Sequence, residues 1–100
     1  MTELESRAIA IQTLEELNKH SSVELAINFE LTEDHPSGFV YFYNTKAYWS
    51  TRDWMNSVAG NGPIFVLKST GKALFLPSSQ SVEKSIADLE ADTSRPRGAL

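Results

Sequence analysis

Residues 23–31 alternate between apolar and other side chains, and this pattern constrains the fold more than any other feature of the chain. Apolar residues stand at every odd position from Val23 to Leu31. Because successive side chains of a strand point to opposite faces, the alternation predicts a strand with one buried side and one wet side. The segment 33–38 holds Asp, Pro, Ser and Gly and predicts a turn, so the aromatic segment 39–43 predicts the returning strand of a hairpin.

An amphipathic helix is predicted before this hairpin, over residues 3–19. Its apolar residues recur at steps of three and four: Leu4, Ala8, Ile11, Leu14 and Leu17. Such spacing places them on one face, which we expect to be the buried face. Thr2 followed by Glu5 has the spacing of a capping box, which satisfies the first free backbone N–H groups of a helix.

The second half of the chain predicts another hairpin and another helix. Gly60-Asn61-Gly62-Pro63 predicts a tight irregular link, because such residues break regular structure. After this link the pattern predicts a strand over 64–67, a returning strand over 73–76 and a helix over about 82–91. Before it, residues 45–59 are irregular, although 52–59 could form a short helix that carries Trp54 into the core.

These elements together predict an α+β fold. It has an N-terminal helix, a four-stranded antiparallel sheet with an irregular insert between strands 2 and 3, and a C-terminal helix. We expect both helices to cover the same face of the sheet. The insert then either covers the other face or leaves an apolar, aromatic patch exposed there, of the kind that marks an interface.

The composition is that of an ordinary globular domain. The chain has 100 residues, a hydrophobic fraction of 41%, a charged fraction of 22% and no cysteine. These values predict one domain without disulfides or thiolate metal sites. The acidic first residues are unlike a secretory signal, and no apolar run approaches the roughly 20 residues of a membrane helix. We therefore expect a cytoplasmic protein with no membrane partner.

Charge is distributed unevenly along the chain. The formal net charge is −4, and residues 1–35 hold eight acidic and two basic residues. An acidic protein repels phosphate backbones, so we expect no nucleic-acid partner. The acidic segment either is a solvated surface or steers the protein towards a basic protein surface.

No motif predicts catalysis or a cofactor. Gly71-Lys72 resembles the end of a phosphate-binding loop, but Val66 and Ala73 stand where that motif needs a glycine and a hydroxyl. His35 follows two acidic residues, yet adjacent side chains of one turn seldom converge on a metal ion. No nucleophile-elbow pattern is present. We therefore expect no cofactor, no metal and no enzymatic activity.

Aromatic residues give the better indication of function, because tyrosine and tryptophan dominate binding hot spots. Several of them fall between residues 41 and 54. The predicted partner-binding residues combine this group with acidic residues of the first third: Tyr41, Tyr43, Tyr48, Trp49, Glu24, Glu30 and Asp34. Trp54 is expected in the core instead.

The second half resembles the immunity protein 35 family, also called YrhB-like domains. The resemblance is carried by Gly60-Asn61-Gly62-Pro63 with the apolar strand after it, by Thr70-Gly71, by the helix after Ser81, and by the aromatic strand Gly38-Phe39-Val40-Tyr41-Phe42. It implies one immunity-protein-35-like domain over residues 1–91. Residues 92–100 hold Pro, Gly and Ser without periodicity and predict a flexible tail. The resemblance also implies a bacterial protein that neutralises a cognate polymorphic or contact-dependent toxin by binding it.

Two other interpretations stay open. A small chaperone-like holdase could use the same apolar surface on unfolded clients. A small enzyme or ligand-binding module would need a deep pocket with converging polar groups. The sequence also leaves open whether the chain forms a homodimer.

Overall fold

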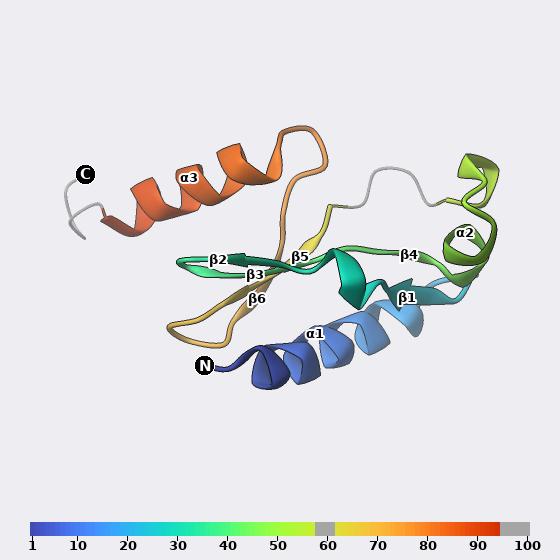
Figure 1. Cartoon of the computed structure of the whole chain (residues 1–100), viewed down its shortest axis with the longest axis horizontal. Helices are drawn as coiled ribbons and strands as arrows, with labels where there is room; N and C mark the ends of the chain where they lie inside the picture. The colour runs from blue at the N-terminus through green and yellow to red at the C-terminus, as the bar shows by residue number, and fades with distance from the viewer. Residues whose placement is uncertain (58–61, 95–100) are drawn as a thin grey trace.

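The computed structural model describes residues 1–57 and 62–94, the last three by their backbone alone (Figure 1). Along the chain its elements are α1 (Glu3–Asn18), β1 (Leu25–Ile27), the 3₁₀ turn η1 (Phe29–Leu31), β2 (Glu33–His35), β3 (Gly38–Tyr41), β4 (Tyr43–Thr45), α2 (Lys46–Thr51), the 3₁₀ turn η2 (Trp54–Asn56), β5 (Ile64–Leu67), β6 (Ala73–Phe75) and α3 (Val82–Ser94).

The described strands form two antiparallel sheets. One has four strands in the order β2-β3-β5-β6, and the other pairs β1 with β4. Only Phe42 separates β3 from β4, so the chain runs directly from the larger sheet into the smaller one. The arrangement confirms the predicted α+β class, with a helix at each end and an insert that here holds α2 and η2.

The predicted strand over residues 23–31 is interrupted. Its middle forms β1 and its end forms η1, while β2 lies inside the segment predicted as a turn. Asn28 explains the break, because its side-chain oxygen accepts a hydrogen bond from the Glu30 N–H at 3.1 Å and caps the 3₁₀ turn. The turn also lets Phe29 meet the edge of the Tyr41 ring, with centroids 6.0 Å apart.

The helices α1 and α3 cover opposite faces of the four-stranded sheet (Figure 1). Leu14 of α1 packs in one cluster with Tyr41 and Ile64, whereas Ile86 of α3 packs in another cluster with Phe65. The prediction that both helices share one face is therefore wrong. The physical reason is that β3 and β5 carry apolar side chains on both faces, and each face needs its own cover.

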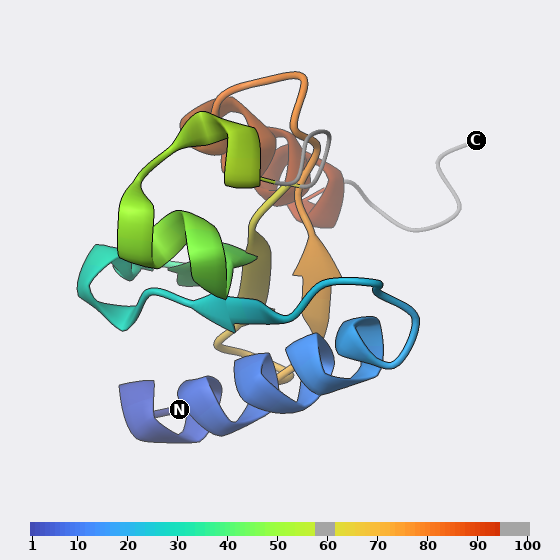
Figure 2. The same cartoon turned by 90° about the vertical axis from the view of Figure 1, so that its right-hand side faces the viewer.

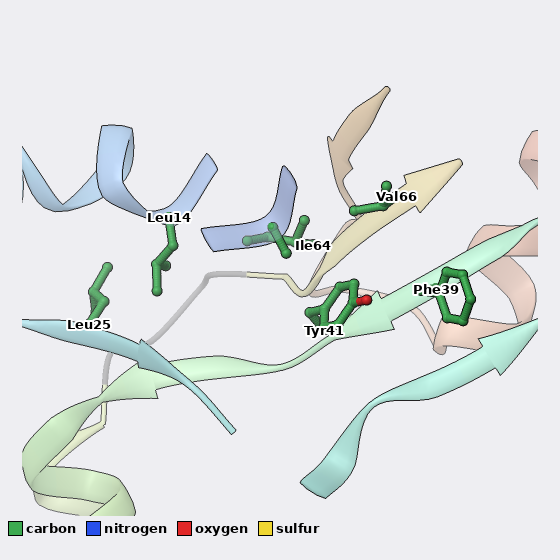
Figure 3. Packing of buried hydrophobic residues seen from close by; sticks show 7 residues of the cluster. Leu14, Leu25, Phe39, Tyr41, Ile64 and Val66 are labelled. Atoms are coloured by element: carbon green, nitrogen blue, oxygen red, sulfur yellow. The ribbon is translucent and has the colours of Figure 1, made fainter. Parts of the chain in front are cut away.

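The buried face of α1 agrees with the predicted one only in part. Leu14 is buried as predicted, but the other buried residues are Ser6 and Ala10. Leu4 is 77% exposed and Ile11 43% exposed, although both were expected in the core. The Ser6 hydroxyl is hydrogen-bonded to the buried Tyr41 hydroxyl, and this polar pair holds the helix in its observed rotation. Figure 3 shows Leu14 in this cluster with Tyr41 and Ile64.

Gly62 is the buried part of the predicted irregular link. A Cβ atom there would lie 1.5 Å from the carbonyl oxygen of Leu76, so only glycine allows the two backbones to approach. The first two residues of that link fall among residues 58–61, and most of the predicted flexible tail falls among 95–100. Both ranges lie outside the described residues. The last helix continues to Ser94, beyond its predicted end at residue 91.

Candidate partner-binding surface

Helix α2 and the turn η2, drawn in green in Figure 2, form one end of the molecule and carry aromatic residues. We call Tyr48, Trp49, Arg52, Trp54 and Met55 the aromatic tip. Tyrosine, tryptophan, arginine and methionine are the residue types that protein interfaces concentrate. The tip is therefore the first candidate for a partner-binding surface.

Thr45 fixes the base of the tip. Its hydroxyl accepts a hydrogen bond from the Tyr48 N–H at 2.9 Å and so caps α2. The same hydroxyl donates to the carbonyl oxygen of Asn56 at 2.5 Å, which ties the end of η2 to the start of α2. Because Thr45 is itself buried, this connection holds α2 and η2 together.

Trp49 anchors α2 on the smaller sheet. Its indole N–H donates to the carbonyl oxygen of Ala26 at 2.7 Å, and the side chain is half-buried. Tyr48 meets its ring edge-on, with centroids 5.2 Å apart, and the Arg52 guanidinium lies 5.1 Å from its ring centroid. Trp49 thus acts as a platform that orients the two side chains available to a partner.

Arg52 adopts a left-handed backbone conformation, with φ 57° and ψ 21°. This conformation ends α2, and the Arg52 N–H donates to the Tyr48 carbonyl oxygen at 2.6 Å. A non-glycine residue in this region is uncommon, since its Cβ atom crowds the backbone. The reversal turns the chain from α2 into η2 and brings the next apolar residues to the surface.

Trp54 and Met55 are the most exposed residues of the tip, at 75% and 70%. The expectation that Trp54 lies in the core is wrong. Of the possible helix over 52–59, the described residues form only the 3₁₀ turn η2, and 58–59 lie outside the described residues. Asp53 accepts a hydrogen bond from the Met55 N–H at 3.0 Å, and Ser57 donates to the Trp54 carbonyl oxygen at 2.7 Å. Asp and Ser around an apolar pair favour a short capped turn, and this signal could have revealed the exposure.

A groove of about 580 Å³ lies beside the tip. Its walls include Val23, Glu24, Lys46 and Met55. The Lys46 ammonium lies 3.0 Å from the Glu24 carboxylate, and both side chains are more than half exposed. Glu24 is therefore the one predicted acidic residue that the structure places next to the aromatic tip, and its charge is balanced there.

Tyr41 does not lie on the surface, so its predicted role as a partner-binding residue is wrong. Its side chain is fully buried, and burial raises the pKa of its hydroxyl above 10.0. The residue therefore contributes to the core and not to a partner contact. Tyr43 is half-buried at the start of β4, where it meets the ring of Phe75 edge-on with centroids 6.2 Å apart. Burial raises the pKa of the Tyr43 hydroxyl as well.

The other predicted acidic residues lie away from the tip. Glu30 is exposed on η1. Asp34 is exposed on β2, which lies on the other side of the molecule from α2 (Figure 1). Asp34 accepts a hydrogen bond from the Lys68 ammonium at 2.6 Å, so it already has a basic partner. The fold thus disperses the acidic residues that we expected to act together.

The second sheet face is covered by α3, so neither alternative left open by the sequence, cover by the insert or an exposed apolar patch, describes it. Within residues 1–57 and 62–94, no cluster of three or more acidic, histidine or cysteine side chains could hold a metal ion. No helix in the same ranges is long and apolar enough to cross a membrane. The geometry of the tip is suited to binding a protein surface.

Comparison with known proteins gives one family. The family model of immunity protein 35 matches residues 5–88. The match extends from α1 into α3 and includes every residue of the aromatic tip. No curated protein and no solved structure matches the chain.

Proposed function

Since the chain belongs to the immunity protein 35 family, we propose that it protects a bacterial cell by binding a cognate toxin protein and neutralising it. The toxin would be part of a polymorphic or contact-dependent competition system. The immunity protein acts in the cytoplasm of the producing cell, where it meets toxin before export or after delivery. Neutralisation follows from binding alone, and the protein itself catalyses no reaction.

The exposure of Trp54 and Met55 on a braced turn is the observation that carries this proposal. Large apolar side chains lose water contacts when a partner covers them, and burying one contributes about 1.5–3 kcal/mol. Because Asp53 accepts and Ser57 donates a hydrogen bond that holds the turn, little backbone freedom is lost on binding. The tip therefore provides an apolar anchor with Arg52 at its rim.

Co-expression with the toxin encoded beside its gene tests the proposal. We expect the chain to co-purify with that toxin at a defined ratio and to restore growth to cells that produce the toxin. A chain that restores no growth and captures no toxin would contradict it.

The holdase alternative predicts a different result in a second assay. A holdase suppresses the aggregation of unrelated heated proteins at near-stoichiometric ratios, whereas an immunity protein binds only its cognate toxin. We expect no suppression. General suppression without selective toxin binding would favour the holdase function.

A further inference from the structure

We propose that the free edge of β6 binds an extended segment of the toxin by strand addition. This proposal rests on the proposed function and names a second contact, separate from the aromatic tip. β6 is the last strand of the sheet order β2-β3-β5-β6, and within the described residues only β5 pairs with it. An unpaired strand edge is a template for another extended chain.

The pairing with β5 shows which backbone groups are available. The Leu76 N–H donates to the Pro63 carbonyl oxygen at 2.9 Å, and the Leu67 N–H donates to the Lys72 carbonyl oxygen at 2.9 Å. In an antiparallel ladder alternate residues bond to the same neighbour. The N–H and C=O groups of the intervening odd residues, 73 and 75, therefore point to the free edge.

Grooves flank this edge on both sheet faces. On the α1 side, a groove of about 470 Å³ is lined by Ile9, Leu17 and Phe75 among others. On the α3 side, a groove of about 600 Å³ is lined by residues that include Leu74 and Leu89. Figure 2 shows β6 at the border of the sheet, with α1 on one side and α3 on the other. Because side chains of a strand alternate, one added strand would fill both grooves.

The polar groups in these grooves indicate the chemistry of the segment. Glu16 lines the α1-side groove, but the Lys19 ammonium already lies 2.8 Å from its carboxylate. Asp88 lines the α3-side groove and has a longer contact of 4.0 Å with the exposed Lys84 ammonium, which is not among the described residues that line the groove. Asp88 is therefore the carboxylate that a basic residue of the segment complements. Ser85 also lines the α3 side, where its residue is 2% exposed and its hydroxyl has no hydrogen-bond partner in the described structure. A polar atom of the segment would satisfy it.

These features favour an extended toxin segment that has apolar side chains for both grooves and also carries a lysine or arginine. A second copy of the chain fits less well. Two-fold pairing of β6 with its copy would put α3 beside α3 and so bring a second Asp88 to the same sheet face. The described lining of the α3-side groove holds no lysine or arginine that such a copy could offer to Asp88.

Hydrogen exchange of the full chain, with and without the catalytically inactivated toxin encoded beside its gene, tests the proposal. We expect the amides of Ala73 and Phe75 to exchange rapidly in the free chain and to become protected by at least tenfold in the complex. Protection confined to the aromatic tip would overturn strand addition and leave the proposed function intact. Failure of the toxin to bind would overturn both.

Matched variants give a second test. Ala73→Pro removes one N–H from the free edge and leaves the hydrogen bonds to β5 in place, whereas Ala73→Ser keeps that N–H. We expect Ala73→Pro to weaken toxin binding about tenfold, the effect of one lost hydrogen bond, and Ala73→Ser to bind like the native chain. Equal affinity of the two variants would contradict the proposal.

The charge of the groove is tested separately through the exposed Asp88→Lys variant. We expect weaker toxin binding, and a smaller difference from the native chain at high salt. Unchanged affinity would contradict a basic segment. Self-association of the free chain that Ala73→Pro abolishes, without loss of toxin binding, would assign the edge to a second copy and overturn the proposal.

Discussion

Tyr41 buries its whole side chain, and its hydroxyl is hydrogen-bonded to Ser6 beneath α1. A buried hydroxyl is tolerated only when it has a partner, so this pair joins the first helix to the sheet. Ser6 also donates to the carbonyl oxygen of Glu3 at 2.9 Å. Replacement of Tyr41 by phenylalanine therefore leaves Ser6 with an acceptor.

The first prediction concerns alkaline pH. Burial raises the pKa of Tyr41 above 10.0 in the folded state, so over the range between the unfolded and folded pKa values the native chain holds the proton more tightly. The contribution of the Tyr41 hydroxyl to the free energy of unfolding is therefore complete below about pH 10 and is lost as the pH rises above it. We expect Tyr41→Phe to reduce this loss in urea titrations between about pH 8 and 11.

A residual loss should persist in Tyr41→Phe, because burial also raises the pKa of Tyr43. At neutral pH the same variant should cost about 1 kcal/mol through the lost hydrogen bond. An unchanged alkaline profile would show that Tyr41 is not protected from solvent.

The second prediction concerns Gly62 and uses Gly71 as its control. A Cβ at Gly62 would overlap the Leu76 carbonyl oxygen, whereas a Cβ at Gly71 would meet the flexible end of Met1 at 3.0 Å. Gly71 has φ +74°, so Gly71→Ala should cost about 1 kcal/mol of unfolding free energy. Gly62→Ala should cost several times more, on the order of 4 kcal/mol, as measured by urea denaturation. Equal costs would contradict the backbone contact.

Among the elements, α1 shows what the sequence could and could not predict. The capping box at Thr2 and Glu5 predicts the start of the helix correctly, because it depends only on neighbouring residues. The predicted buried face was correct at Leu14 and wrong at Leu4 and Ile11, which are exposed while Ala10 is buried. The polar Ser6 is buried instead, because its hydroxyl is hydrogen-bonded to Tyr41 of β3, and this contact sets the rotation of the helix.

The third prediction tests that rotation. Leu14→Ala should lower the free energy of unfolding by about 2–5 kcal/mol, because Leu14 is 6% exposed in the core cluster. Leu4→Ala should change it by less than about 0.5 kcal/mol, because Leu4 is exposed. A similar loss of unfolding free energy in the two variants would show that Leu4 is buried together with Leu14, as the spacing of apolar residues alone predicts.

The positions of α3 and of the tip residues also depend on contacts between segments that are distant in the sequence. The consecutive apolar residues of β3 and β5 indicate burial on both faces, but the covering helix is identified only by the tertiary packing of Ile86. Within the tip, the binding role of Tyr48 and Trp49 stays a prediction. Trp54 is exposed where the sequence predicts a core residue, because aromatic content alone does not separate buried from exposed positions.

At the scale of the whole molecule, the two terminal helices cover the sheet faces and leave two distinct surfaces for a partner. The aromatic tip lies at the end formed by α2 and η2, and the free edge of β6 lies between α1 and α3 (Figure 2). The core does not depend on Trp54 or Met55, because both are exposed. Binding and stability can therefore be changed independently at the tip.

The most direct measurement is the affinity of the cognate toxin for Trp54→Ala, determined by calorimetry beside Leu4→Ala. The two side chains are almost equally exposed, at 75% and 77%, but they lie on η2 and α1 respectively. We predict that Trp54→Ala weakens binding by about 2 kcal/mol, roughly 30-fold, with the unfolding midpoint unchanged, and that Leu4→Ala binds like the native chain. Native affinity in Trp54→Ala would contradict the assignment of the aromatic tip as the toxin-binding surface.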